Sequence, residues 1–93
     1  VRSAQQIAAL IVRDREQFLA NKSASIPAAR LLTQLPSNPI VTTNRAIELL
    51  DVSKPTALKA IETLVQAGIL KETTGKRRDR IYAYAAYLAL LAD

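Results

Sequence analysis

The hydrophobic positions of residues 41–70 repeat with the period of an α-helix in two runs that almost touch. The first run begins near Thr43, a candidate N-cap, and is broken by Asp51 and Val52. Its apolar side chains would line one side of a short helix: Ala46, Ile47, Leu49 and Leu50. The second run begins at once with Ser53, another good N-cap. Two helices joined by so few residues predict a helix-turn-helix.

The second run predicts a helix whose two sides differ in chemistry. Pro55 falls in the first turn, where its missing N–H costs nothing, and Gly68 ends the run. At about 100° per residue, the side chains that point inward are Ala57, Ile61 and Leu64, and those that point away are Pro55, Thr56, Lys59, Glu62, Thr63 and Gln66. The outward side is short-chained with lysine in its N-terminal half, which suits a helix lying in a DNA major groove.

Upstream, residues 4–20 predict a long first helix, with Ser3 and Gln6 as a capping box. One stripe is apolar and consists of Ile7, Leu10, Ile11, Phe18 and Leu19. The charged residues are expected on the solvent side: Arg13, Asp14, Arg15 and Glu16. Three interpretations stay open for this helix: simple packing, a connector to a further N-terminal domain, or a surface for a second copy.

Residues 26–35 predict a second helix, capped by Ser25 and with Pro27 in its first turn. Its apolar positions are Ile26, Ala29, Leu31, Leu32 and Leu35. Pro36 and Pro39 end it and force an extended passage. Because residues 40–42 are β-branched, they predict a very short strand.

After the second run of the helix-turn-helix, the period changes from helical to two. Residues 69–74 and 80–84 predict two strands, with Ile81 and Ala83 on one face and Tyr82 and Tyr84 on the other. The turn between them, TGKRRD, carries glycine and cations. A final short helix would cover the core through Tyr87, Leu88, Leu90 and Leu91.

These elements predict one compact domain that is mainly α with a small antiparallel β-hairpin, a winged helix-turn-helix. Within it, residues 1–22 would form a leading connector helix and residues 23–93 the winged helix-turn-helix domain proper. A hairpin directly after the second helix of a helix-turn-helix would be the wing.

The amino-acid composition excludes several kinds of functional site. Neither cysteine nor histidine occurs among the 93 residues, so thiolate metal sites, disulfides and the commonest general base are all excluded. Intrinsic catalysis is therefore not expected, no metal or cofactor is implied, and the composition suits a cytoplasmic location. No apolar run has the length of a membrane span. Because methionine is also absent, we interpret the chain as a piece of a longer protein.

The net charge of +5 is concentrated in part in one cluster at the predicted hairpin turn: Lys76, Arg77, Arg78 and Arg80. These cations would neutralise phosphates of double-stranded DNA. The predicted helix adds Ser53, Lys54, Thr56 and Lys59 near bases and flanking phosphates. Alternatively, Ser53 is only a cap, Lys59 only a solvated residue, and the cluster only a solvated loop. The tyrosines are expected to pack in the wing and core rather than to stack on bases.

The stretch VSKPTALKAIETLVQAGILKETTGKRRDRIYAY, residues 52–84, followed by YLALL, resembles the C-terminal winged-helix region of Fic-family (filamentation induced by cAMP) proteins. The resemblance covers about the last half of the chain well and extends upstream only in layout. It implies a parent protein whose N-terminal catalytic domain transfers AMP from ATP to hydroxyl side chains of target proteins (AMPylation). The histidine-containing motif of that domain is absent here. This chain also has Ala85 where the family often begins its last helix with an acidic residue.

The leading hypothesis is a non-catalytic DNA-binding module, by resemblance the C-terminal regulatory domain of a bacterial-type Fic adenylyltransferase, with the catalytic domain of the same chain as a partner. A second hypothesis is a protein-interaction or dimerisation module, forming a homodimer or presenting targets to the catalytic domain. A third is a stand-alone transcription regulator, against which the missing initiator methionine argues.

Overall fold

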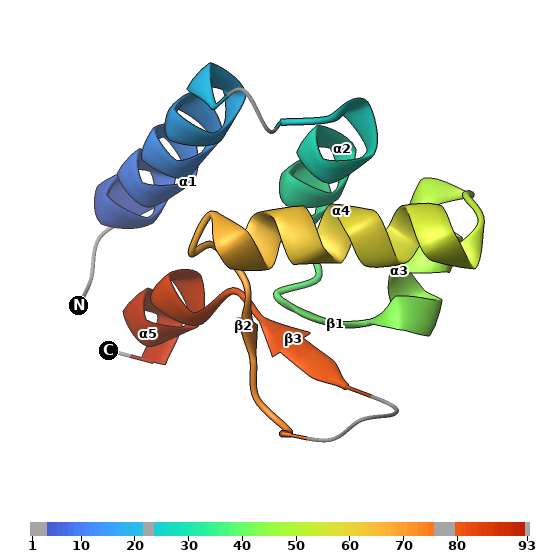
Figure 1. Cartoon of the computed structure of the whole chain (residues 1–93). Helices are drawn as coiled ribbons and strands as arrows, with labels where there is room; N and C mark the ends of the chain where they lie inside the picture. Colours follow the sequence, from blue (N-terminus) through green and yellow to red (C-terminus); the bar gives the residue numbers. More distant parts are fainter. Residues whose placement is uncertain (1–3, 22–23, 76–79, 93) are drawn as a thin grey trace.

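The computed structural model describes residues 4–21, 24–75 and 80–92. This part of the chain is mainly helical with a small three-stranded antiparallel sheet (Figure 1). Its elements, in order, are α1 (Ala4–Ala20), α2 (Ile26–Gln34), β1 (Ile40–Thr42), α3 (Thr43–Leu50), α4 (Lys54–Gln66), β2 (Lys71–Glu72), β3 (Ile81–Ala83) and α5 (Ala85–Ala92). Among these helices, none is both long and apolar enough to cross a membrane.

The first turns of α2, α3 and α4 are each capped by a hydroxyl side chain, which helps to explain why the sequence located these helices well. Ser25 accepts a hydrogen bond from the Ala28 backbone N–H, and Ser53 caps α4, so both predicted caps are confirmed. The predicted cap of α3 is wrong by one residue. Thr42 has the extended backbone of an N-cap and its hydroxyl accepts from the Arg45 N–H at 3.1 Å, whereas Thr43 is already helical. Ser3, the predicted cap of α1, and residues 22–23, where the domain boundary was expected, lie outside the described residues.

The connection between α3 and α4 is as short as predicted. Asp51 ends α3 in the left-handed backbone region at φ 53°, which aspartate tolerates better than most residues. The chain then enters α4, whose inward residues are all buried: Ala57, Ala60, Ile61 and Leu64. At the other end, Gly68 takes φ 79° and the backbone N–H groups of Ile69 and Leu70 close on the Leu64 carbonyl. The turn therefore leads directly into β2.

β3 is the central strand of the sheet, with β1 on one side and β2 on the other. Val41 lies opposite Tyr82, and Lys71 lies opposite Ala83. The predicted strand at residues 40–42 is thus confirmed, and it closes the sheet on the side away from β2. Tyr82, Ala83 and Tyr84 are all buried, so burial does not alternate along this strand. The tyrosines pack in the core, as the sequence predicted.

α1 packs through most of the predicted apolar stripe, since Leu10 and Phe18 are buried and Ile7 and Ile11 are half-buried. Its buried positions are Leu10, Asp14 and Phe18, spaced four residues apart, so Asp14 lies inside rather than on the solvent side. The Tyr84 hydroxyl donates a hydrogen bond to the Asp14 carboxylate at 2.6 Å, which satisfies this buried acid. Conversely, Leu19 of the predicted apolar stripe and Ile26, an apolar position of α2, are exposed. Leu19 is off the packing row, and Ile26 lies at the first position of α2, ahead of the core contacts.

Candidate nucleic-acid interface

An open groove of about 890 Å³ lies between α4, the start of α3 and the β2–β3 hairpin. Three apolar side chains contribute to it, namely Leu58, Val65 and Tyr82. Its polar lining residues are Thr42, Thr43, Asn44, Lys54, Glu62, Gln66, Glu72 and Arg80. The groove thus joins segments that are far apart in the sequence, and it extends along α4 from its first residue to its last.

Two of the predicted site residues meet in this groove. Lys54 begins α4, and Arg80 precedes β3, yet both are exposed and both line the groove. Lys59 is exposed one turn further along α4 but is not among the lining residues. By helical spacing it shares the outer side of α4 with Glu62 and Gln66. The helix and the base of the hairpin therefore present cations to a common side.

Ser53 and Thr56 form a cap rather than a pair of free hydroxyls. The Ser53 hydroxyl accepts from the Thr56 backbone N–H at 3.5 Å, and the two side-chain oxygens lie 3.0 Å apart within hydrogen-bonding distance. These contacts satisfy the first turn of α4. Both residues position α4, and their direct use as base-reading groups would require this pair to open.

The remaining predicted residues, Lys76, Arg77 and Arg78, lie outside the described part of the chain. The turn that leads to them is organised by Glu72, which sequence reasoning did not single out. Its carboxylate accepts hydrogen bonds from the Thr74 N–H, from the Thr74 hydroxyl at 2.6 Å and from the Gly75 N–H at 2.7 Å. The Thr74 hydroxyl bond and the Gly75 bond are the main causes that lower the pKa of Glu72 below its usual 4.5, and Arg80 contributes to the same direction. Glu72 therefore holds the base of the hairpin turn in place.

A comparison with models of known protein families found no match, and a search of curated proteins found no significantly similar sequence. The geometry therefore carries the functional argument. Within the described residues, no group of acidic side chains is arranged to hold a metal ion.

The groove is less basic than the sequence cluster implied. Glu62 and Glu72 line it together with Lys54 and Arg80, so two negative charges face two positive ones. Glu62 lies on the outward side of its helix, as predicted. Glu72 could have been noticed because it comes three residues before Gly75, the spacing at which a carboxylate reaches the N–H groups of a turn.

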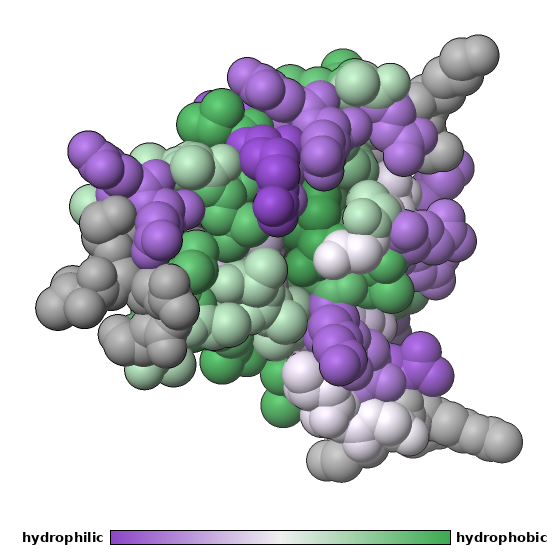
Figure 2. All heavy atoms as spheres, turned by 90° about the vertical axis from the view of Figure 1, so that its left-hand side faces the viewer, coloured by the Kyte–Doolittle hydropathy of each residue, from purple (hydrophilic) through white to green (hydrophobic). Residues whose placement is uncertain are grey.

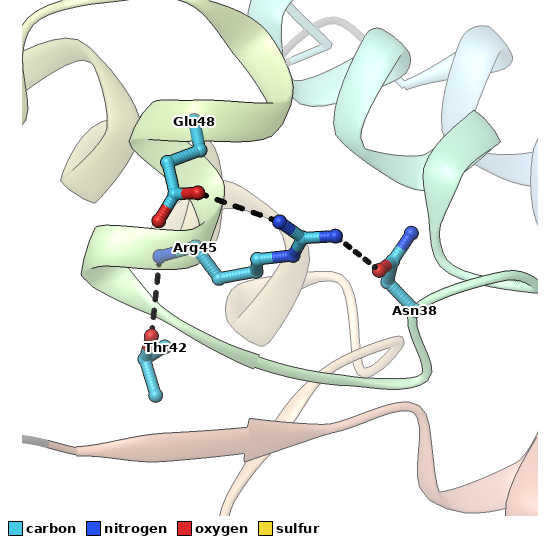
Figure 3. Close-up of polar contacts among 4 residues, drawn as sticks. All are labelled: Asn38, Thr42, Arg45 and Glu48. Carbon is cyan, nitrogen blue, oxygen red and sulfur yellow. Dashed lines mark hydrogen bonds and ion pairs between the residues drawn. The ribbon is translucent and has the colours of Figure 1, made fainter.

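A further cation, Arg45, lies on α3 beside this groove (Figure 3). Its guanidinium contacts Glu48 at 3.5 Å and the Asn38 side-chain oxygen at 3.4 Å. All of these groups are solvent-accessible, so the contacts add little stability. Their effect is positional, because they join the segment before β1 to α3.

Proposed function

We propose that this chain is a winged helix-turn-helix module that binds double-stranded DNA. In this proposal α3 and α4 are the helix-turn-helix, and the β2–β3 hairpin is the wing. One observation carries the proposal: Lys54 of α4 and Arg80 of the hairpin line the same groove. A duplex that contacts one of these elements can therefore contact the other without any rearrangement of the protein.

The outer side of α4 is the element proposed to enter the major groove, as the second helix of a helix-turn-helix does. Lys54 and Lys59 would contact phosphates or a guanine edge, and Gln66 is the one side chain on that side that can read adenine in a bidentate manner. Ser53 and Thr56 would support the helix through their cap. With one such reader, at the far end of the helix, the expected sequence selectivity is modest.

The wing would supply most of the affinity, because phosphate neutralisation releases counterions. Four wing cations, Lys76, Arg77, Arg78 and Arg80, would contribute about −3.6 to the slope of log K against log salt in a duplex titration, and a phosphate contact of Lys54 would add about −0.9. Replacing Lys76, Arg77 and Arg78 together with alanine would remove about 2.7 of that slope. Glu62 works in the opposite direction, so Glu62→Gln is expected to tighten binding.

A charge-matched pair of variants tests the groove itself. K54A/R80A removes the two cations of the groove, while R15A/R30A removes two exposed arginines on α1 and α2. Fluorescence anisotropy with a mixed-sequence duplex, between about 50 and 200 mM salt, should give a slope about 1.8 smaller for the first variant. The second should keep the slope of the unmodified chain. If that chain shows no duplex affinity even at the lowest salt, the DNA proposal is wrong.

A second function is favoured by the acidic and apolar lining of the groove. Glu62, Glu72, Leu58 and Val65 would suit a protein segment that carries both basic and hydrophobic side chains. The variant E62Q separates the two functions, because it should strengthen DNA binding and weaken the binding of such a segment. The measurement is the same titration performed with a duplex and with a labelled basic peptide.

We further propose, from the resemblance of residues 52–84, that the module regulates a Fic-type AMP-transferring catalytic domain of the same protein. The chain itself is assigned no catalytic role. The test is the coding sequence upstream of Val1, where a histidine-containing Fic motif is expected. Its absence there would leave the stand-alone regulator as the better hypothesis.

A further inference from the structure

The two glutamates of the groove differ in what their carboxylates do. Both Glu62 and Glu72 line the groove together with two cations. Glu62 is exposed on the outward side of α4. Glu72 is half-buried in β2, and one oxygen of its carboxylate, Oε2, accepts hydrogen bonds from the Thr74 N–H, the Thr74 hydroxyl and the Gly75 N–H. Two residues of equal charge therefore stand in one groove, and Glu72 also organises a turn.

The hydrogen bonds of Glu72 continue across the hairpin to β3. The Thr74 hydroxyl, which donates to Glu72 at 2.6 Å, accepts from the Ile81 backbone N–H at 3.4 Å. The Ile81 carbonyl accepts from the Thr73 N–H at 2.9 Å and from the Thr73 hydroxyl at 3.2 Å. Both backbone groups of Ile81 are thus bonded to the two residues that follow Glu72. Because Ile81 comes directly after Arg80, these bonds fix the backbone beside this groove cation.

Hydrogen bonds, rather than apolar packing, hold this part of the hairpin. Residues 71–75 contribute no side chain to the hydrophobic core. Figure 2 shows hydrophilic and weakly polar residues at the lowest part of the molecule, the level at which Figure 1 places the hairpin. Hydrogen bonds to an ionised acceptor are roughly twice as strong as those between neutral groups. The Glu72 carboxylate is therefore the main acceptor on which the order of this turn depends.

We propose that Glu72 is a positioning residue for the duplex interface. Its carboxylate orders the turn through Thr74, and the ordered turn presents Arg80 to the phosphate backbone. Lys54 approaches the same duplex from α4. A turn that is ordered before binding loses less conformational entropy when the duplex binds. This role rests on the proposed binding of DNA, and it means that an acidic residue promotes the binding of an acidic ligand.

The alternative is that Glu72 acts only through its negative charge, as Glu62 does. In that case, removal of either carboxylate would strengthen duplex binding, whichever neutral residue replaced it. A positioning role predicts a different pattern at residue 72. Glutamine keeps a carbonyl oxygen that can accept the hydrogen bonds of Thr74 and Gly75, whereas alanine provides no acceptor. The comparison of alanine with glutamine therefore separates the acceptor from the charge.

Four variants, E72A, E72Q, E62A and E62Q, test this difference by fluorescence anisotropy with a mixed-sequence duplex at about 50 mM salt. E72A should bind about two- to tenfold more weakly than E72Q, because its turn must be ordered during binding. E62A and E62Q are the matched control and should bind equally, since the Glu62 carboxylate is exposed on a helix. Thermal unfolding followed by circular dichroism checks that each variant is folded at the temperature of the titration.

A second set of variants tests the connection through Thr74. T74V removes the hydroxyl that joins Glu72 to Ile81, and it should weaken duplex binding as E72A does. The double variant E72A/T74V should bind within about twofold of E72A alone, because both changes break one chain of bonds. The control T33V removes an exposed hydroxyl on α2, which donates to the Ala29 carbonyl at 3.1 Å. It should leave the affinity unchanged.

The outcomes distinguish this role from the proposed function. Equal affinities of E72A and E72Q, in a chain that binds the duplex, would overturn the role of Glu72 and leave DNA binding standing. Independent effects of E72A and T74V, multiplying in the double variant, would overturn it as well. An unmodified chain without duplex affinity at about 50 mM salt would overturn the DNA proposal itself, and the role of Glu72 with it.

Discussion

The two exposed sides of this protein are built on opposite principles. The groove beside α4 is polar, carries charges of both signs and gathers residues from α3, α4 and the hairpin. The side formed by α1 and α5 has no charge on α5, whereas α1 carries two arginines, one aspartate and one glutamate. Each side is nevertheless held by one carboxylate: Glu72 at the hairpin turn, and Asp14 between α1 and Tyr84. The difference lies in solvent access, since Glu72 acts near the surface and Asp14 is buried.

This contrast separates two kinds of interaction within one small domain. Charged partners are attracted over a distance and released by salt, which suits the groove. The packing of α1 and α5 depends instead on burial of apolar side chains and on one buried hydrogen bond, which salt screens little. The following predictions test whether the two sides are as independent as the structure indicates.

The largest effect is expected from equal truncations on α4 and α5. Leu64 is fully buried and Leu91 is half exposed. Leu64→Ala should lower the free energy of unfolding by about 2–5 kcal/mol, because it leaves a cavity under the groove. Leu91→Ala should change the free energy of unfolding by no more than about 0.5 kcal/mol. Urea denaturation measures both. Similar losses would mean that α5 is part of the core rather than a covering element.

The next effect concerns the bond between Asp14 and Tyr84. Asp14→Ala and Tyr84→Phe should each cost about 1–3 kcal/mol, because each leaves a buried polar partner unsatisfied. The double variant should cost less than the sum, with a coupling energy of about 0.5–3 kcal/mol. Tyr82→Phe is the control, since Tyr82 lines the groove instead. Its effect should add to that of Asp14→Ala within about 0.5 kcal/mol. Additivity of Asp14 and Tyr84 would show that α1 is not held by this contact.

The sequence predicted the groove side better than the α1–α5 side, and the reason is physical. The ends of α2 and α4 follow from local chemistry, because each end is set by residues next to it. These residues are the hydroxyl caps, Pro27, Pro55 and Gly68. The use of Asp14 depends on a tyrosine 70 residues away. Periodicity places a charged residue in solvent by default, and no local signal marks it as a partner.

The candidate site was predicted only in outline for a related reason. The sequence predicts Lys54 from its place at the start of a helix and Arg80 from a cationic cluster, and the structure brings both to one groove. Glu62 and Glu72 line the same groove, but a prediction based on positive charge does not identify them. The sequence predicts Ser53 and Thr56 as DNA contacts, but in the structure their hydroxyls hydrogen-bond to each other. A hydrogen-bond partner depends on side-chain direction as well as residue type, and direction requires coordinates.

The smallest effects are expected from changes of pH. Alkaline pH should weaken the contact between α1 and Tyr84, and acidic pH should weaken the hairpin turn at Glu72. Burial, and then the hydrogen bond to Asp14, raise the pKa of Tyr84 above its usual 10.0. The folded state thus holds this proton more tightly than the unfolded state does. Its contribution to stability is complete below pH 10 and is lost progressively as the pH rises further. Tyr84→Phe should therefore show a shallower decline in stability as the pH rises above 10, whereas an unchanged decline would assign the alkaline loss to other groups.

Protonation of Glu72 at acidic pH should affect the hairpin turn and leave α1 unchanged. Because its pKa is lowered from 4.5, the folded state binds this proton more weakly than the unfolded state. Its contribution is present above pH 4.5 and is lost as the pH falls through the folded-state pKa. Protonation would weaken the bonds to Thr74 and Gly75, so amide exchange at these two residues should show weaker protection on acidification, relative to the intrinsic rates. Glu72→Gln should lose that pH dependence while the exchange of α1 amides stays unaltered. If α1 loosens together with the hairpin, the two sides are coupled through β3, and the independence inferred from their chemistry fails.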